Sequence, residues 1–220
     1  EPNLNREHPF QRLPQKYKKA EKKEVWELSE NSAGVSITFA SNTTELIVKW
    51  SVKQNLRMNH MTDTAIKGLD LYERRNQKWY YVCTGLPNGK KNKKILLEDL
   101  ERKKREYCLF LPLYDTLTNL EIGIDDDSSL DNIKFNNKPI VFYGTSITQG
   151  GCASRPGLVH TNIISRALGY ECINLGFSGN GHLENSIGTI ISNIDASLYV
   201  IECMYNVDKK MINEKILPLI

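Results

Sequence analysis

The sequence lacks any apolar run that approaches the ~18 to 20 residues of a membrane-spanning helix. It also lacks the basic start and apolar core of a secretory signal, and it begins with Glu1 rather than with methionine. We therefore expect no transmembrane segment. We also expect that an upstream segment has been processed or left out, which is compatible with a secreted or periplasmic protein.

A strong excess of charge of one sign is also missing. The formal net charge is only +3, and the basic clusters Lys16–Lys23, Lys90–Lys94 and Arg102–Arg105 are interrupted by Glu or lie beside hydrophobic runs. Such clusters are typical of a solvated surface, so the charge gives no reason to expect a nucleic acid partner. The oligomeric state is left open by the sequence.

Cysteine is scarce and irregularly spaced: five residues, with no Cys-Xaa-Xaa-Cys pair. This spacing does not fit a structural zinc site, and we expect neither a metal nor an organic cofactor. Cys83, Cys108 and Cys203 lie in strand-like runs and are expected to be buried thiols. A bridge between Cys152 and Cys172 could form in an oxidising compartment.

Residues 24–124 have the pattern of an all-β domain. Short apolar or alternating segments are separated by Asn, Gly, Pro and charged breaks at nearly regular intervals, which is typical of a sandwich or barrel. The predicted strands are 25–29, 34–41, 44–52, 68–75, 78–85, 93–100, 105–113 and 120–125. Pro87-Asn88-Gly89 is predicted to form a hairpin turn. The sequence thus predicts a β-sandwich preceded by an N-terminal extension, residues 1–23.

Residues 125–137 are polar and are predicted to be a linker. The second domain, 138–220, alternates strand-like and helix-like segments. Strands are predicted at 139–144, 171–176 and 197–204, with helices at 158–169 and 183–194 between them. This alternation predicts a parallel sheet with crossover helices, and function in such sheets collects at the carboxyl ends of the strands.

Three polar segments follow those strand ends. Ser146 follows the first strand, the glycine-rich segment around Gly179 follows the second, and Asn206 follows the third. An acyl-transfer site needs a nucleophile, such as a serine, and nearby backbone or amide N–H donors that stabilise a tetrahedral oxyanion. Taken singly, the serine could belong to a turn, the glycines could cradle a phosphate, and Asn206 could cap a helix. Their order on successive strands favours the acyl-transfer interpretation.

These motifs resemble those of the SGNH (GDSL-type) hydrolase superfamily. Gly144-Thr145-Ser146 is similar to its first block, usually Gly-Asp-Ser, and the resemblance makes Ser146 the nucleophile. The segment 174–179 is similar to the second block, in which Gly179 is the oxyanion glycine. The segment 202–206 is similar to the strand that ends in Gly-Xaa-Asn-Asp, which makes Asn206 the oxyanion asparagine.

The stretch 151–157 and Gly68-Leu69-Asp70-Leu71-Tyr72 narrow the resemblance to a bacterial subgroup with an N-terminal Gly-Xaa-Asp-Leu-Tyr β-domain. The resemblance spans most of residues 24–207. It implies two domains: a jelly-roll-like sandwich and a three-layer α/β domain of the SGNH hydrolase fold. Asp70 is expected to organise a turn or the contact between domains.

The chain departs from this family at several positions. Thr145 stands where Asp is usual, Tyr205 where Gly is usual, and Val207 where Asp is usual. The general base of the family is a His three residues after an orienting Asp, near the C-terminus. No Asp here is followed by His at that spacing, and no His occurs after His182. A serine needs a base to act as a nucleophile at neutral pH.

Residues 139–220 are enough for about two and a half βα units at ~30 residues each. We therefore expect an incomplete parallel sheet, a chain truncated at the C-terminus, and a base supplied from beyond residue 220. Neither His160 nor His182 is assigned as a substitute base. The expected activity is hydrolysis of carboxylic esters, and the family resemblance implies deacetylation of a carbohydrate. The alternative is a non-catalytic glycan-binding or remnant protein with an incomplete triad.

Overall fold

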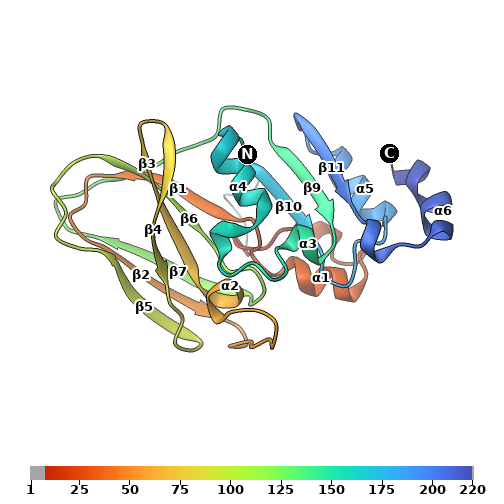
Figure 1. Ribbon diagram of the computed structural model, residues 1–220, viewed down its shortest axis with the longest axis horizontal. Coiled ribbons are helices and arrows are strands. Elements are labelled where there is room, and N and C mark those ends of the chain that lie inside the picture. The colour runs from red at the N-terminus through yellow and green to blue at the C-terminus, as the bar shows by residue number, and fades with distance from the viewer. Residues whose placement is uncertain (1–7, 220) are drawn as a thin grey trace.

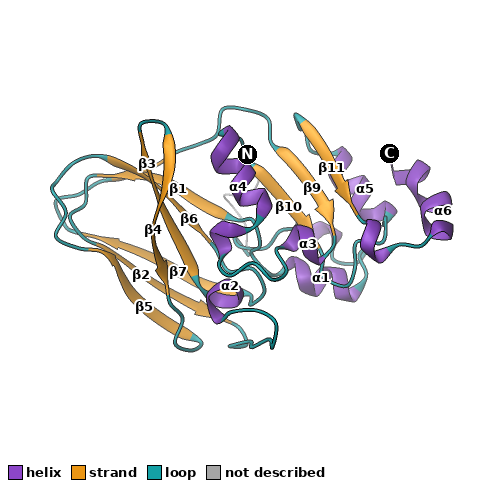
Figure 2. Cartoon of the chain, viewed as in Figure 1, coloured by secondary structure: helices purple, strands orange, loops and turns teal. Residues whose placement is uncertain are grey.

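The structure is a computed structural model that describes residues 8–219. A β-rich half and an α/β half lie side by side along the long axis of the molecule (Figure 1). Helices are concentrated in the second half and strands in the first, as Figure 2 shows. The division into two kinds of structure agrees with the sequence-based prediction. The limits of the two domains and the jelly-roll connection remain predictions.

The β-rich half contains two sheets. One has the strand order β4-β3-β6-β1-β8 and the other the order β5-β2-β7, and all their neighbouring strands are antiparallel. The strands are β1 (Ser36–Ser41), β2 (Leu46–Val52), β3 (Leu69–Arg75), β4 (Lys78–Gly85), β5 (Lys91–Leu97), β6 (Arg105–Phe110), β7 (Leu117–Ile124) and β8 (Leu130–Asn132).

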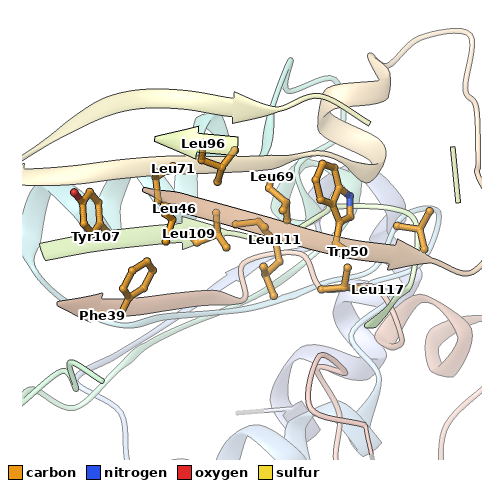
Figure 3. Close-up of a cluster of buried hydrophobic side chains, with 12 residues drawn as sticks. Phe39, Leu46, Trp50, Leu69, Leu71, Leu96, Tyr107, Leu109, Leu111 and Leu117 are labelled. Atoms are coloured by element: carbon orange, nitrogen blue, oxygen red, sulfur yellow. The ribbon is translucent and has the colours of Figure 1, made fainter. Parts of the chain in front are cut away.

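The core of this half lies between the two sheets (Figure 3). Leu71 and Leu109 come from the five-stranded sheet, and Trp50 comes from the other; none is more than 1% exposed. Alternation within β2 explains the packing, because Leu46, Val48, Trp50 and Val52 are buried while the residues between them are not. The sequence prediction of a sandwich rests on this alternation.

Two details of the predicted sandwich are wrong. Pro87-Asn88-Gly89 does not close a hairpin, because β4 pairs with β3 while β5 pairs with β2. The turn instead carries the chain from one sheet to the other. The segment 25–29, predicted as a strand, belongs to helix α1 (Lys23–Ser29). Helix α2 (Asp63–Lys67) and a 3-10 turn, η1 (Gln15–Tyr17), complete this part of the chain.

The α/β half is built on a parallel sheet of order β10-β9-β11, in which β9 is the central strand. The predicted strands and helices occur in the predicted order, and α3 and α6 are additional helices. The elements of this half are β9 (Ile140–Gly144), α3 (Ser146–Gln149), η2 (Pro156–Leu158), α4 (His160–Leu168), β10 (Cys172–Gly176), α5 (Asn185–Ser192), β11 (Leu198–Glu202), η3 (Met204–Asn206) and α6 (Lys209–Leu219).

Helices cover both faces of this sheet. Ile164 of α4 packs with Phe142 on one face, whereas Ile187 of α5 packs with Val141 and Tyr143 on the other. The alternation of side chains along β9 sends neighbouring residues to opposite faces, so the whole strand is buried. In Figure 1, α4 also lies on the side of the sheet that faces the sandwich.

The chain before the sandwich belongs to the core of the α/β half. Leu13, Val25 and Trp26 are buried in the cluster that contains Tyr143 and Phe177. A run of five residues is too short for its periodicity to separate helix from strand, and tertiary packing against the α/β half decides for helix. Of the predicted extension, residues 1–7 lie outside the described residues.

The predicted linker contains a strand. Leu130–Asn132 forms β8, which pairs with β1 and is itself the edge strand of the five-stranded sheet, although all three residues are exposed. Only the backbone of β8 is needed for this pairing, so polar side chains do not prevent it. The polar composition that predicted a linker therefore did not reveal the strand.

All five cysteines are free thiols in the structure, so the open possibility of a Cys152–Cys172 bridge is not realised there. Cys152 is exposed whereas Cys172 is buried, and burial raises the pKa of the Cys172 thiol to about 12. No helix among residues 8–219 is long and apolar enough to cross a membrane.

Candidate functional site

The three predicted site segments meet at one edge of the parallel sheet. Gly144 at the end of β9 is in register with Gly176 of β10 on one side and Glu202 of β11 on the other. Backbone hydrogen bonds continue beyond the strands: Phe177 donates to Gly144 over 2.9 Å, and Thr145 donates to Glu202 over 3.2 Å. The segments after the strands therefore begin from fixed and adjacent positions.

Ser146 is the first residue of α3, directly after β9. It is partly exposed, so its hydroxyl can be reached from solvent. Thr145 caps the helix, because its hydroxyl oxygen accepts a hydrogen bond from the Ile147 N–H over 3.3 Å. The turn closes at Gly150, whose φ of +111° is in the left-handed region, and Gly150 and Gly151 both donate to the Ser146 carbonyl.

Glycine at the strand ends allows α3 to lie directly against the sheet. A Cβ on Gly144 would stand 2.2 Å from the Thr148 hydroxyl oxygen. A Cβ on Gly176 would stand 2.1 Å from the backbone nitrogen of Gln149. Neither distance is tolerated between non-bonded atoms, so larger residues at these positions would push the serine turn away from the sheet.

The segment after β10 forms a loop around Gly179. Ser178 N–H donates to the Gln149 side-chain oxygen over 2.8 Å, and Asn180 N–H donates to the Phe177 carbonyl over 2.9 Å. Gly179 has a φ of +69°, and its N–H has no hydrogen-bond partner within residues 8–219. Nothing lies within 4 Å of the position that a Cβ on Gly179 would occupy, so the loop borders open space there.

Asn206 lies in η3 and contacts this same loop. Its side-chain amide donates to the backbone carbonyl of Asn180, and its backbone N–H donates to Cys203 over 3.0 Å. The structure thus brings Asn206 to the Gly179 loop, as the order of the strands predicts. An amide nitrogen carries two hydrogens, so one remains after the bond to Asn180.

A buried pair beneath the loop holds its far end. The Tyr143 hydroxyl donates to the Glu184 carboxylate, which also accepts from the His182 N–H over 2.8 Å. Burial raises the pKa of Tyr143. Burial alone would also raise the pKa of Glu184, but the hydrogen bond from Tyr143 and backbone donors lower it overall. Glu184 is therefore held as a carboxylate that anchors the chain after the loop.

Glu202 is a site residue that the sequence analysis did not single out. One carboxylate oxygen accepts from the Thr145 hydroxyl over 2.8 Å and from the Thr148 hydroxyl over 3.1 Å. The other oxygen is buried and has no hydrogen-bond partner within residues 8–219. A charged residue at the end of an apolar strand is the signal that could have revealed it.

Arg12 is the second residue that sequence reasoning missed. Its side chain is 9% exposed at most, and it donates to the backbone carbonyls of Asn174 and Gly176 over 3.1 and 2.6 Å. It also donates to the Leu28 carbonyl over 2.7 Å, and its guanidinium lies 5.0 Å from the ring centre of Phe177. Burial lowers the pKa of Arg12 to about 9, so it remains charged at neutral pH. Arg12 thus fastens α1 to the start of the Gly179 loop.

The four histidines of the chain lie within residues 8–219, and none forms a hydrogen bond with the Ser146 hydroxyl. The His160 ring packs edge-on against Phe142, and burial lowers its pKa while the charge of Glu202 opposes that change. His182 Nδ1 lies 3.5 Å from Glu184, and His8 and His60 are exposed. The site as described therefore has a candidate nucleophile and candidate donors.

Asp70 of the Gly-Xaa-Asp-Leu-Tyr motif joins the two halves. It is fully buried, and one of its oxygens accepts from Arg155 and from the Gly157 N–H, each over 2.9 Å. The Thr84 hydroxyl donates to the other oxygen over 2.6 Å. This arrangement agrees with the expected role of Asp70 in the domain contact. No cluster of His, Cys, Asp and Glu suited to a metal ion occurs within residues 8–219.

A β-sandwich joined to a parallel α/β domain, with a serine and a glycine loop at its strand ends, defines a class of two-domain hydrolase-like proteins. The family described as the N-terminus of SGNH-hydro-type esterases, GxDLY, matches residues 2–130. The GDSL-like lipase/acylhydrolase family matches residues 137–220. The chain belongs to this family of SGNH-type esterases with a GxDLY N-terminal domain.

One solved structure gives the same assignment, and a second shares the fold. A structure described as a GDSL-like lipase from Bacteroides ovatus is 36% identical, with a TM-score of 0.91, over 96% of this chain and 63% of its own. This chain therefore spans less than two thirds of that relative. The salicylyl-acyltransferase SsfX3 from a tetracycline biosynthetic pathway is 17% identical, with a TM-score of 0.67 over 86% of this chain and 52% of its own. It supports the fold alone. A comparison with curated proteins gives no match.

Proposed function

We propose that the protein hydrolyses carboxylic esters with Ser146 as the nucleophile. The observation that carries this proposal is the position of Ser146: it is partly exposed at the carboxyl edge of the sheet, and it follows Gly144, which is in register with Gly176 just before the Gly179 loop. Within residues 8–219 the Gly179 N–H has no hydrogen-bond partner. Family membership supports it, because Ser146 lies in the segment matched by the GDSL-like lipase/acylhydrolase family.

In the proposed reaction, the Ser146 Oγ attacks the acyl carbon and its proton passes to a general base. The N–H groups of Ser146 and Gly179 and the second amide hydrogen of Asn206 stabilise the oxyanion. The bond to the alcohol then breaks, and the alcohol leaves with the proton returned by the base. Water hydrolyses the acyl-serine by the same steps.

The base is proposed to come from a His-containing segment beyond residue 220. No histidine among residues 8–219 forms a hydrogen bond with the Ser146 hydroxyl, and the candidates His160 and His182 are engaged with Phe142 and Glu184. The 220-residue chain alone is therefore expected to be inactive. The proposal includes the predicted domain limits: 24–124 for the sandwich and 138–220 for the start of the catalytic domain.

The proposed substrate is an acetylated carbohydrate, and the protein is proposed to act outside the cytoplasm. Both points rest on analogy with relatives rather than on the chemistry of the site. The alternative function is glycan binding by a non-catalytic protein, which is favoured by the lack of a base within hydrogen-bond distance of Ser146 among residues 8–219.

The test is hydrolysis of p-nitrophenyl acetate by the 220-residue chain, by a longer chain that continues to the natural C-terminus, and by Ser146→Ala in each. We expect turnover only in the longer chain, with a loss of at least about a thousandfold on Ser146→Ala. A longer chain that is inert, or that is unaffected by Ser146→Ala, would favour the non-catalytic alternative.

A further inference from the structure

A groove of about 570 Å³ runs from the sandwich to the Gly179 loop. It lies between α1 and the segment 53–58 that follows β2, and Ser178 and Asn180 form the end nearest the proposed oxyanion site. The groove therefore takes its walls from both halves of the chain and borders the residues on either side of Gly179.

Tyr114 connects the groove to the serine turn. It lines the groove, and its hydroxyl lies 3.4 Å from the position of a Cβ built on Gly151. The Cβ of Ser146 lies 3.4 Å from that same position. The Tyr114 hydroxyl and the Ser146 side chain therefore both border Gly151, so Tyr114 marks the part of the groove nearest the serine turn.

The groove carries an excess of negative charge. Helix α1 contributes Glu24 and Glu27, and Glu30 follows at its C-terminal end. The facing lysine, Lys53, forms an ion pair with Glu30 over 2.8 Å. Glu24 has no ion pair within residues 8–219, and Glu27 has only a highly exposed contact with Lys23 at 3.8 Å, which neutralises little. The charges of two carboxylates thus remain effective along one wall.

The other polar groups of the groove are uncharged amides and hydroxyls. They alternate with the apolar surface of Leu28, Leu56 and Met58, and Tyr114 adds an aromatic ring. The uncharged polar residues are Asn31, Gln54, Thr116, Ser178 and Asn180. Such a lining suits a polyhydroxy molecule, which offers hydroxyl groups to amides and C–H faces to apolar side chains.

We propose that this groove binds the alcohol part of the ester, and that Glu24 and Glu27 make it select neutral polyhydroxy alcohols against anionic ones. The inference rests on the proposed function, because it assigns a substrate class to the same site. A sugar without a carboxylate, sulfate or phosphate group is accepted, whereas a uronic acid is repelled by the wall of α1.

The experiment compares two esters that differ in one charge. The protein at its natural length is assayed for acetate release from a mono-acetylated methyl glucoside and from the matching methyl glucuronoside, at low salt. The ratio of the two kcat/KM values should favour the neutral ester. In Glu24→Gln/Glu27→Gln, this ratio should fall about fivefold, because repulsion by two nearby carboxylates through water has that size.

The control variant is Glu121→Gln/Asp127→Asn, which removes the same net charge from two exposed positions in and after β7. Its ratio should equal that of the unaltered protein. If the ratio is the same in the groove variant and the control variant, the inference is overturned. Raising the salt concentration should lower the ratio of the two kcat/KM values for the unaltered protein, because salt screens the repulsion. The ratio for the groove variant should stay almost unchanged.

Failure of the proposed function has a different signature. If the unaltered protein hydrolyses neither of these esters nor p-nitrophenyl acetate, the proposed function is wrong, and the groove is then tested by binding alone. Ser146→Ala, with and without the two glutamine substitutions, is titrated with the two esters in a calorimeter. Tighter binding of the glucoside that depends on Glu24 and Glu27 supports the groove. Equal binding of both esters, or no binding, overturns it.

Discussion

At the residue scale, Thr145 and Glu202 form a hydrogen-bonded pair where β9 and β11 end. By the family resemblance, Asp is usual at the position of Thr145. Here the carboxylate comes from the neighbouring strand, since the Thr145 hydroxyl donates to Glu202 over 2.8 Å. The departure from the family pattern at Thr145 therefore has a structural counterpart: threonine can donate to Glu202, whereas an ionised aspartate could only be repelled by it.

We expect Thr145→Asp to lower the free energy of unfolding by about 2 kcal/mol at pH 7, because it places two carboxylates together and removes a donor. The loss should shrink as the pH falls towards about 4, where one carboxyl is protonated and can donate to the other. Urea unfolding at several pH values measures both effects. Adding Glu202→Gln should restore most of the stability at pH 7; additive losses in the double variant would show that the two residues are not coupled.

The site residues that sequence reasoning found are those with a visible local pattern. Ser146 and Gly179 follow apolar strands that end in glycine, and in the structure both residues lie just after the ends of β9 and β10. Arg12 has no such pattern, and the only local sign of Glu202 is a charge at the end of an apolar strand, which does not identify its partners. Their significance comes from contacts across β11 to α3 and from α1 to β10, which depend on how distant segments pack. Local sequence cannot specify these contacts.

At the element scale, the segment from Arg12 to the end of α1 acts as a brace for the α/β half. The guanidinium of Arg12 binds carbonyls at the end of β10 and in α1, while Val25 and Trp26 enter the core beside Phe177. Within residues 8–219, no carboxylate forms an ion pair with this guanidinium, and all but one of its hydrogen bonds there go to backbone carbonyls. Several buried carbonyls therefore depend on one side chain.

Arg12→Met should lower the free energy of unfolding by about 3 kcal/mol, because buried carbonyls of Asn174, Gly176 and Leu28 lose their donor. Arg12→Lys should lower the free energy of unfolding less, since an ammonium group can donate to some of these carbonyls. Urea unfolding measures these changes, and Arg57→Met, at a side chain that is 81% exposed, is the matched control. Equal stability of Arg12→Met and the control would contradict the role of a brace.

Helices and strands could be predicted from the sequence where the alternation or helical spacing of apolar residues extends over many residues, or where a glycine or another break marks the end. The β-strands with alternating burial and α4, which ends at Gly169 in the left-handed conformation, follow from local pattern. Helix α1 and strand β8 do not. The first is a short apolar run whose conformation is decided by packing, and the second is a polar segment recruited by the edge of β1.

At the scale of the whole molecule, the contact between the halves is polar at its centre. Asp70 binds Arg155 and the Gly157 N–H, and the Arg155 guanidinium stacks over Tyr81 at 3.9 Å. On α4, Arg166 stacks over Tyr72 at the same distance. A Cβ on Gly157 would lie 2.4 Å from the Tyr72 ring, so the halves approach as closely as glycine permits. Such an interface couples the two halves only while its charges are paired.

Asp70→Asn should loosen this contact without disturbing either core. The asparagine keeps an acceptor for one donor but leaves the Arg155 charge, which is 23% exposed, without its partner, at a cost of about 2 to 4 kcal/mol. We expect the heat-capacity profile of the 220-residue chain to change from one transition to two, because the sandwich and the α/β half would then unfold separately. Asp131→Asn, which removes an exposed pair with Lys104 on β8, should leave the profile unchanged. A single transition at the original temperature in Asp70→Asn would mean that the packing of α4, rather than the Asp70 carboxylate, holds the halves together.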